Sequence, residues 1–187
     1  RQSLQLSRRE ARRMSRLIDD MLELGRLEMV EALALRPINL LALVEDVVVQ
    51  TASSAAQRDM SVELAADSAL PLVRGNADRL RQVFLNLLDN ALKYAGDGAR
   101  VMVTLEPKDG SVACAVCDTG PGIPPEHLPL VTQRFYRAAP EAVEGSGLGL
   151  ALVKGILRLH GSDLTVVSPV AEGRGTCVTF DLAVTGE

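Results

Sequence analysis

The chain has 187 residues, of which 47% are hydrophobic and 24% are charged. These fractions are typical of a globular protein, so they exclude a disordered chain, a collagen-like repeat and a small disulfide scaffold. The formal net charge of −4 argues against a general nucleic-acid binder, which usually has a basic surplus. Trp is absent and aromatic residues make up only 3%, which argues against stacking platforms for bases.

The segment from Arg1 to about Glu31 predicts one long helix, with apolar side chains at three- and four-residue spacing that form a single stripe. A lone helix of this kind cannot bury its stripe, so it needs a partner helix. No apolar run approaches the roughly 20 residues that a membrane span requires, and the sequence pattern predicts no signal peptide. Because the chain begins without Met inside this helical pattern, we expect it to be an excised piece of a longer protein.

From Asn39 onward, helical and strand patterns alternate. Apolar spacing predicts helices over 39–57, 78–95 and 148–160. Strands are predicted over 60–64, 101–105, 112–117, 164–167 and 176–182, with a turn at Gly75-Asn76 and a hairpin at 108–110. This order predicts an α+β fold, a two-layer sandwich in which a mixed sheet is covered by helices on one face and preceded by one long helix.

The cysteines are Cys114, Cys117 and Cys177. The first two have the C-x-x-C spacing of a zinc or redox pair. However, alternation along a strand would place them on opposite faces, and no second Cys/His pair stands at ligand spacing. We therefore expect buried or half-buried thiols in a reducing compartment.

Asn86, Asn90 and Lys93 lie at positions i, i+4 and i+7 of the helix predicted over 78–95, on one face. Amide oxygens suit Mg²⁺ and an ammonium group suits a phosphate, although an isolated helix with this pattern favours a solvated polar face. The segment 118–124 puts a carboxylate at the end of a buried strand, followed by two glycines. It is also the pattern of an Asp-initiated turn.

The segment 145–150, Gly-Ser-Gly-Leu-Gly-Leu, leads into the helix predicted over 148–160. Glycines before a helix N-terminus let backbone N–H groups face phosphate oxygens, but a single Gly-rich stretch is a weak signal. The last cluster, Gly173-Arg174-Gly175-Thr176, predicts by itself only a hairpin turn.

In this order, the four clusters resemble the N, G1, G2 and G3 boxes of sensor histidine kinases, which belong to the GHKL ATP-binding superfamily. Residues 134–137, Arg-Phe-Tyr-Arg, resemble the F box of that family. Residues 16–24 resemble the second helix of its dimerisation and histidine-phosphotransfer hairpin. The resemblance implies that residues 1–36 are part of this hairpin and that residues 37–187 are the catalytic ATP-binding domain.

The resemblance also implies roles for individual residues. Asn90 would hold Mg²⁺, and Asn86, Lys93 and Arg137 would be the catalytic residues around the phosphates of ATP. Asp118 would accept the amino hydrogens of adenine. The other implied nucleotide contacts are Tyr94, Gly120, Gly122, Ile123, Gly145, Gly147, Leu148, Gly149 and Thr176. Residues 138–144 would form a short lid.

For the intact protein, the resemblance implies a protein histidine kinase of a two-component system. It would be a homodimeric phosphoprotein that transfers the γ-phosphoryl group of Mg-ATP to a histidine and then to the receiver domain of a response regulator. ATP and ADP would be its ligands, and it would not bind nucleic acid. The present chain would be the cytoplasmic domain of a membrane-anchored bacterial sensor. The acceptor histidine is expected on the first hairpin helix, so His127 and His160 are expected to be structural or surface residues.

Two other classes remain open. The first is a GHKL-type ATPase or serine kinase. Asn86 stands where the hydrolases of the superfamily have a glutamate that activates water, and an amide cannot act as a general base. The neighbouring carboxylate, Asp89, is expected to point elsewhere. The second is a nucleotide-free pseudokinase that serves as a dimerisation module. Loss of Asn90, Asp118 or the 145–149 glycines would indicate this class.

Overall fold

The computed structural model describes residues 14–15, 17–18, 21–22, 24–25, 33–67, 69–138, 145–170 and 173–186. The described residues between Met14 and Gly25 are helical, as predicted, and the other residues of the predicted helix up to residue 31 lie outside the described residues. Residues 33–36 of the segment assigned to the hairpin are described and are not helical. Residues 139–144 of the predicted lid also lie outside them. No helix within the described ranges combines the length and apolar composition that a membrane span requires.

The main sheet is mixed and five-stranded, with the order β2-β4-β5-β7-β6. β2 runs parallel to β4, and the other neighbours are antiparallel. The strands are β2 (Ser61–Ala66), β4 (Arg100–Lys108), β5 (Ser111–Asp118), β6 (Thr165–Val167) and β7 (Thr176–Ala183). The predicted hairpin between β4 and β5 is confirmed.

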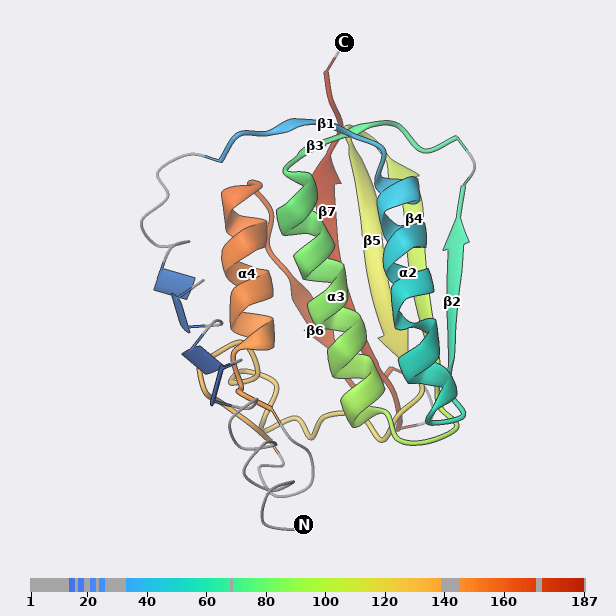
Figure 1. Cartoon of the computed structure of the whole chain (residues 1–187), viewed down its shortest axis with the longest axis vertical. Helices are drawn as coiled ribbons and strands as arrows, with labels where there is room; N and C mark the ends of the chain where they lie inside the picture. Colours follow the sequence, from blue (N-terminus) through green and yellow to red (C-terminus); the bar gives the residue numbers. More distant parts are fainter. Residues whose placement is uncertain are drawn as a thin grey trace.

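Three helices, α2 (Leu40–Ala56), α3 (Ala77–Tyr94) and α4 (Gly149–Leu159), cover one face of this sheet (Figure 1). The α+β two-layer fold is therefore as predicted. The side chains of Asn39 and Asn76 accept hydrogen bonds from backbone N–H groups at the starts of α2 and α3. The N-cap residue of α4, Leu148, provides no side-chain hydrogen bond.

The core lies between the helices and the sheet. Along β5, Val112, Cys114 and Val116 are buried, and the intervening residues are only partly buried. This alternation matches the two faces of a strand. Phe84 of α3 packs against Phe180 of β7 with ring centroids 5.6 Å apart, which ties the helical layer to the sheet.

A separate two-stranded sheet joins β1 (Arg36–Ile38) to β3 (Val73–Gly75). The prediction of a simple turn at Gly75-Asn76 is therefore wrong at Gly75, which ends β3. Strands of three residues are too short to show an alternating pattern, and Pro37 is tolerated in β1 because that strand has a single neighbour. The domain boundary predicted between residues 36 and 37 falls within β1 and stays a prediction.

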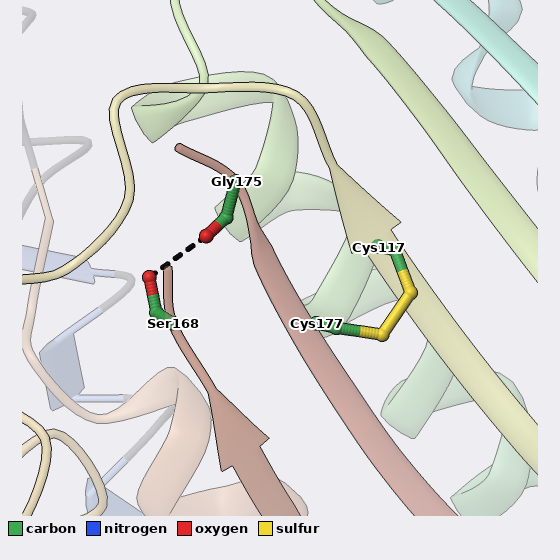
Figure 2. The surroundings of a disulfide bond; sticks show 4 residues. All are labelled: Cys117, Ser168, Gly175 and Cys177. Atoms are coloured by element: carbon green, nitrogen blue, oxygen red, sulfur yellow. Dashed lines mark hydrogen bonds between the residues drawn. A yellow bond between two sulfur atoms is a disulfide. The ribbon is translucent and has the colours of Figure 1, made fainter. Parts of the chain in front are cut away.

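The expectation of free thiols is wrong for two of the three cysteines. Cys117 and Cys177 form a disulfide, because they are direct cross-strand partners in the register of β5 and β7 (Figure 2). Cys114 lies on the opposite, helix-covered face of β5 and remains a free, buried thiol, as expected. Burial raises the pKa of the Cys114 thiol.

His160 follows α4 and connects it to the start of α3. Its Nδ1 donates to the Ile156 carbonyl oxygen at 2.8 Å, and its Nε2 accepts from the Asn76 backbone N–H at 3.1 Å. Both ring nitrogens are therefore used by a neutral imidazole, and burial lowers the pKa of His160. The sequence-based expectation of a structural role for His160 is confirmed.

Candidate nucleotide-binding site

A cavity of about 580 Å³ lies between α3, the end of β5, the segment that follows β5, and the start of α4. Twelve of the predicted site residues line it, and the exceptions are Gly120 and Leu148. The tertiary structure thus brings the four sequence clusters to one place. The twelve are Asn86, Asn90, Lys93, Tyr94, Asp118, Gly122, Ile123, Arg137, Gly145, Gly147, Gly149 and Thr176.

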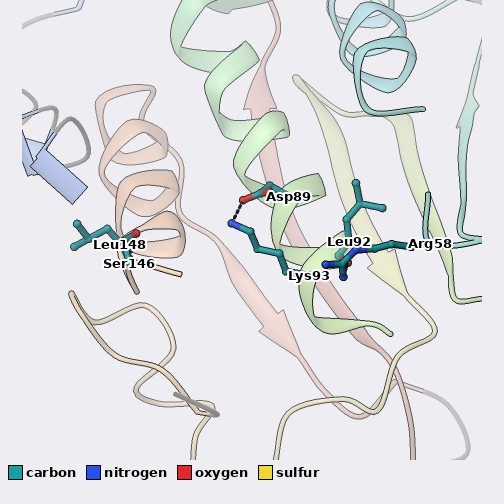
Figure 3. Close-up of polar contacts among 6 residues, drawn as sticks. All are labelled: Arg58, Asp89, Leu92, Lys93, Ser146 and Leu148. Carbon is teal, nitrogen blue, oxygen red and sulfur yellow. Dashed lines mark hydrogen bonds and ion pairs between the residues drawn. The ribbon is translucent and has the colours of Figure 1, made fainter. Parts of the chain in front are cut away.

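The α3 wall of the cavity carries Asn86, Asn90, Lys93 and Tyr94. The ammonium group of Lys93 contacts the carboxylate of Asp89 one turn earlier (Figure 3). Asp89 also lines the cavity, so the expectation that it points elsewhere is wrong. Positions i and i+4 lie on the same side of a helix, which brings the Asp89 side chain to Lys93.

The C-terminal end of α3 is held by an arginine from outside the helix. Arg58, just after α2, donates from Nη1 to the Leu92 carbonyl oxygen at 2.7 Å (Figure 3). Carbonyl groups in the last turn of a helix have no partner within the helix, and a cation favours their negative dipole end. This contact fixes the part of α3 that presents Lys93 and Tyr94 to the cavity.

Asp118 stands at the end of β5, on the inner wall of the cavity. Burial raises the pKa of its carboxyl group, and backbone N–H groups of Gly120 and Thr176 oppose that shift. The Gly120 N–H donates to Oδ1 at 2.8 Å. The carboxylate is thus held in place by the backbone while being short of the solvation it would have in water.

Gly120 and Gly122 allow close approach around this aspartate. A Cβ at Gly120 would lie 2.4 Å from the Ala95 Cα, so Gly120 lets the end of β5 pack against the end of α3 and does not itself line the cavity. At Gly122, φ is +81° and a Cβ would lie 3.0 Å from the Ser168 Oγ. Glycine is the residue that adopts this conformation without strain.

The Gly-rich segment brings the start of α4 against the amides of α3. A Cβ at Gly149 would lie 3.5 Å from both side-chain polar atoms of Asn90 and 3.9 Å from Oδ1 of Asn86. At Gly147, φ is +71° and a Cβ would lie 2.7 Å from the backbone of Phe135. Leu148 is fully buried, so it anchors this segment in the core.

Some cavity residues were given no nucleotide contact in the sequence analysis. His127, expected to be a structural or surface residue, and Tyr136 of the 134–137 segment both line the cavity, and Nδ1 of His127 lies 2.6 Å from the Tyr136 hydroxyl. The residues are nine positions apart in an irregular segment, so no periodicity could have paired them. Leu17, from the described part of the N-terminal helix, also reaches the cavity wall.

This arrangement is that of a known protein class. The histidine kinase-, DNA gyrase B- and HSP90-like ATPase family matches residues 75–186, and the chain belongs to this family. Within it, the chain has the fold and motifs of the catalytic ATP-binding domain of sensor histidine kinases.

Among curated relatives, drug sensory protein A of Synechocystis sp. is 36% identical over 97% of this chain, and the match covers 29% of that protein. Full-length ShkA in complex with AMPPNP has a similar structure, with a TM-score of 0.84 and 28% identity over 100% of this chain and 40% of that one. The mycobacterial sensor histidine kinase MprB has a TM-score of 0.69 and 31% identity over 82% of this chain and 99% of that one. The chain thus spans less than a third of the length of the Synechocystis protein.

Proposed function

We propose that the cavity binds Mg-ATP, with the adenine at Asp118 and the triphosphate between α3 and the start of α4. The observation that carries this proposal is the half-buried Asp118 carboxylate on the wall of a cavity that also contains the amides of Asn86 and Asn90. The AMPPNP complex of the similar ShkA kinase supports it.

Asp118 has the electrostatic character that an adenine contact requires. Its carboxylate has lost part of its solvation, since burial raises its pKa, and a ligand N–H group would supply the missing hydrogen bond. The exocyclic amino group of adenine is such a donor. Tyr94 lines the cavity, and its hydroxyl would lie 3.2 Å from a Cβ added at Gly145, which also lines the cavity. We propose that the Tyr94 ring packs beside the base.

The other end of the cavity suits phosphate groups. α4 begins without a side-chain cap, so its first N–H groups and the positive end of its dipole remain for an anion. Lys93 and Arg137 line the same cavity and add positive charge. Among the described residues, these are the features that favour a triphosphate over a neutral ligand.

The amides of Asn86 and Asn90 fit a magnesium ion that is shared with phosphates. Both side-chain amides lie within 4 Å of the Cβ position at Gly149, at the start of α4. Amide oxygens are hard ligands of the kind Mg²⁺ prefers. The described residues contain no cluster of three or more His, Cys, Asp or Glu side chains that could hold a metal. Asn90 would hold the ion through its amide oxygen, and bound Mg²⁺ would supply positive charge that neutralises the phosphate groups.

We further infer the reaction of the intact protein. The bond from the γ-phosphorus to the oxygen of ADP breaks, and a bond to an imidazole nitrogen of an acceptor histidine forms. The phosphoryl group then passes to an aspartate on a response regulator. The residues of this chain position the triphosphate, which is most of what phosphoryl transfer requires. His160 is buried with both nitrogens engaged, and Nδ1 of His127 is paired with the Tyr136 hydroxyl in an irregular segment. We therefore place the acceptor on a hairpin helix outside this sequence.

ATP hydrolysis is the second candidate. The carboxylate of Asp89 lies in the cavity wall, and a carboxylate can activate water. However, Asp89 is paired with Lys93, and Asn86 occupies the position of the hydrolytic glutamate. Release of free phosphate from ATP at a steady rate by the purified chain would favour hydrolysis over the kinase reaction.

Isothermal titration calorimetry of the 187-residue chain with ATP and Mg²⁺ tests the site. We expect binding by the wild type and a loss of at least about tenfold in affinity for Asp118→Ala, since a hydrogen bond to a charged group contributes about 1.5–3 kcal/mol. Asp109→Ala, on the exposed β4–β5 turn, is the matched control and should bind normally. Equal affinity of Asp118→Ala and the wild type would refute the site.

Labelled ATP tests the reaction. The chain alone should form no acid-labile phosphoprotein. Adding a hairpin segment that carries the acceptor histidine of a close relative should produce one on that segment.

We also propose the setting of the intact protein. It would be a homodimer formed through the hairpin to which residues 1–36 contribute, and a membrane-anchored sensor whose catalytic domain, residues 37–187, lies in the cytoplasm. The names of the relatives as sensory proteins support this assignment.

A further inference from the structure

Ser168, between β6 and β7, is a buried side chain that the nucleotide motifs do not include. It contacts three backbone or side-chain groups near the adenine end of the cavity (Figure 2 shows one of them). We infer that Ser168 is a positioning residue that sets base specificity, because it orients the Thr176 hydroxyl so that this end of the cavity offers only hydrogen-bond acceptors. This inference rests on the proposed adenine site.

The three contacts determine where the hydroxyl hydrogens point. Ser168 Oγ lies 2.8 Å from the Gly175 carbonyl oxygen, and a carbonyl can only accept, so Ser168 donates its one hydrogen there. The Ile123 N–H donates to the same Oγ at 2.7 Å. The remaining contact, 3.3 Å to the Thr176 Oγ1, must therefore have Thr176 as the donor.

The direction of the Thr176 hydroxyl hydrogen determines what this residue offers to a ligand in the cavity. Thr176 lines the cavity, whereas its hydroxyl hydrogen is directed to Ser168, so its lone pairs remain for a ligand. Asp118 is the direct cross-strand partner of Thr176 and its ionised carboxylate is also an acceptor. Two acceptors thus stand side by side at the inner end.

This arrangement discriminates between purines. Adenine presents an amino group with two N–H donors, whereas guanine presents a carbonyl oxygen at the same ring position. A guanine base would place this oxygen against two acceptors, which is unfavourable. If the Thr176 hydroxyl could rotate, it would donate to the guanine oxygen and the discrimination would weaken.

The backbone around Ser168 holds these groups in place. The Gly175 N–H donates to the Gly120 carbonyl oxygen at 2.8 Å, and a Cβ at Gly175 would lie 2.7 Å from the Asp118 carbonyl oxygen. The end of β5 and the segment after it are thus in direct contact with Gly175, which also accepts the Ser168 hydroxyl hydrogen. The Ser168 hydroxyl oxygen also accepts the hydrogen bond from the Ile123 N–H, which ties the segment after β5 to the segment between β6 and β7.

The test compares the affinities of the 187-residue chain for Mg-ATP and Mg-GTP by calorimetry. For Ser168→Ala, we expect the ratio of ATP to GTP affinity to fall by about tenfold, roughly the value of one hydrogen bond. Ser162→Ala is the matched control, because the Ser162 hydroxyl donates to the neighbouring Asp163 carbonyl oxygen, at 3.5 Å, and Ser162 does not line the cavity, so the ratio should not change. A merely structural role of Ser168 would lower both affinities together and leave the ratio unchanged, which would overturn the inference.

Thr176→Val gives an independent arm if Ser168→Ala does not fold. It removes the oriented acceptor, so the ATP to GTP ratio should again fall, and the double variant should show no further drop. An unchanged ratio in Thr176→Val would overturn the inference. Asp118→Ala separates failure of the proposed adenine site from failure of the Ser168 inference. If Asp118→Ala binds ATP like the wild type, the adenine site itself is wrong. If Asp118→Ala loses ATP binding while Ser168→Ala keeps the wild-type ratio of ATP to GTP affinity, only the role of Ser168 is refuted.

Discussion

Gly120→Ala tests how closely the end of β5 must approach the end of α3. The added Cβ would lie 2.4 Å from the Ala95 Cα and 2.9 Å from both the Cβ and the carbonyl oxygen of Ala95. The first contact is about 1 Å shorter than ordinary carbon contacts allow. Backbone atoms cannot rotate away as a flexible side chain could, so the strand end and the helix end must separate.

The displacement would affect two hydrogen bonds of Gly120. Its N–H donates to the Asp118 carboxylate and its carbonyl oxygen accepts from Gly175, both at 2.8 Å. Overpacking of this kind lowers the free energy of unfolding by about 1–3 kcal/mol. Because Asp118 moves with the strand end, the Kd for ATP should also rise by about tenfold, equivalent to about 1.4 kcal/mol.

Urea unfolding and ATP calorimetry measure the two effects. Gly186→Ala is the matched control, since a Cβ there meets nothing within 4 Å, and it should leave both quantities unchanged. If Gly120→Ala unfolds within about 0.5 kcal/mol of the wild type and binds ATP normally, the inferred close packing is wrong.

Three further predictions concern stability and thiol chemistry. Since His160 is neutral when folded and its pKa is lowered, the unfolded chain binds the proton more readily, so the free energy of unfolding should fall as the pH drops below about 6.5 and should fall less in His160→Gln. Thiol titration of the denatured chain should find one free thiol, Cys114, before reduction and three afterwards, and a count of three before reduction would exclude the Cys117–Cys177 disulfide. Asn39→Ala removes the side-chain cap of α2 and should lower the free energy of unfolding by about 1 kcal/mol in urea titrations.

Much of the fold could be predicted from the sequence because its signals are local. The three helices that cover the sheet and the five strands of the main sheet follow the apolar spacing within each segment, and the Asn39 cap precedes its helix directly. The helical face of Asn86, Asn90 and Lys93 also follows from spacing alone. The order of the four Gly- and Asx-containing clusters then indicated the family, which residues 75–186 confirm.

Other features were decided only by the tertiary structure. The Cys117–Cys177 disulfide joins residues 60 positions apart, and the contact of Ser168 with Ile123 spans 45. Neither can be deduced locally. The disulfide depends on the register between β5 and β7, and register depends on the packing of the whole sheet. Ser168 and Ile123 lie in two connecting segments that meet only in the tertiary structure. The sequence by itself therefore determined the elements and the chemical groups of the site. The tertiary structure decided which of those groups meet, since contacts between distant segments form only when the layers pack together.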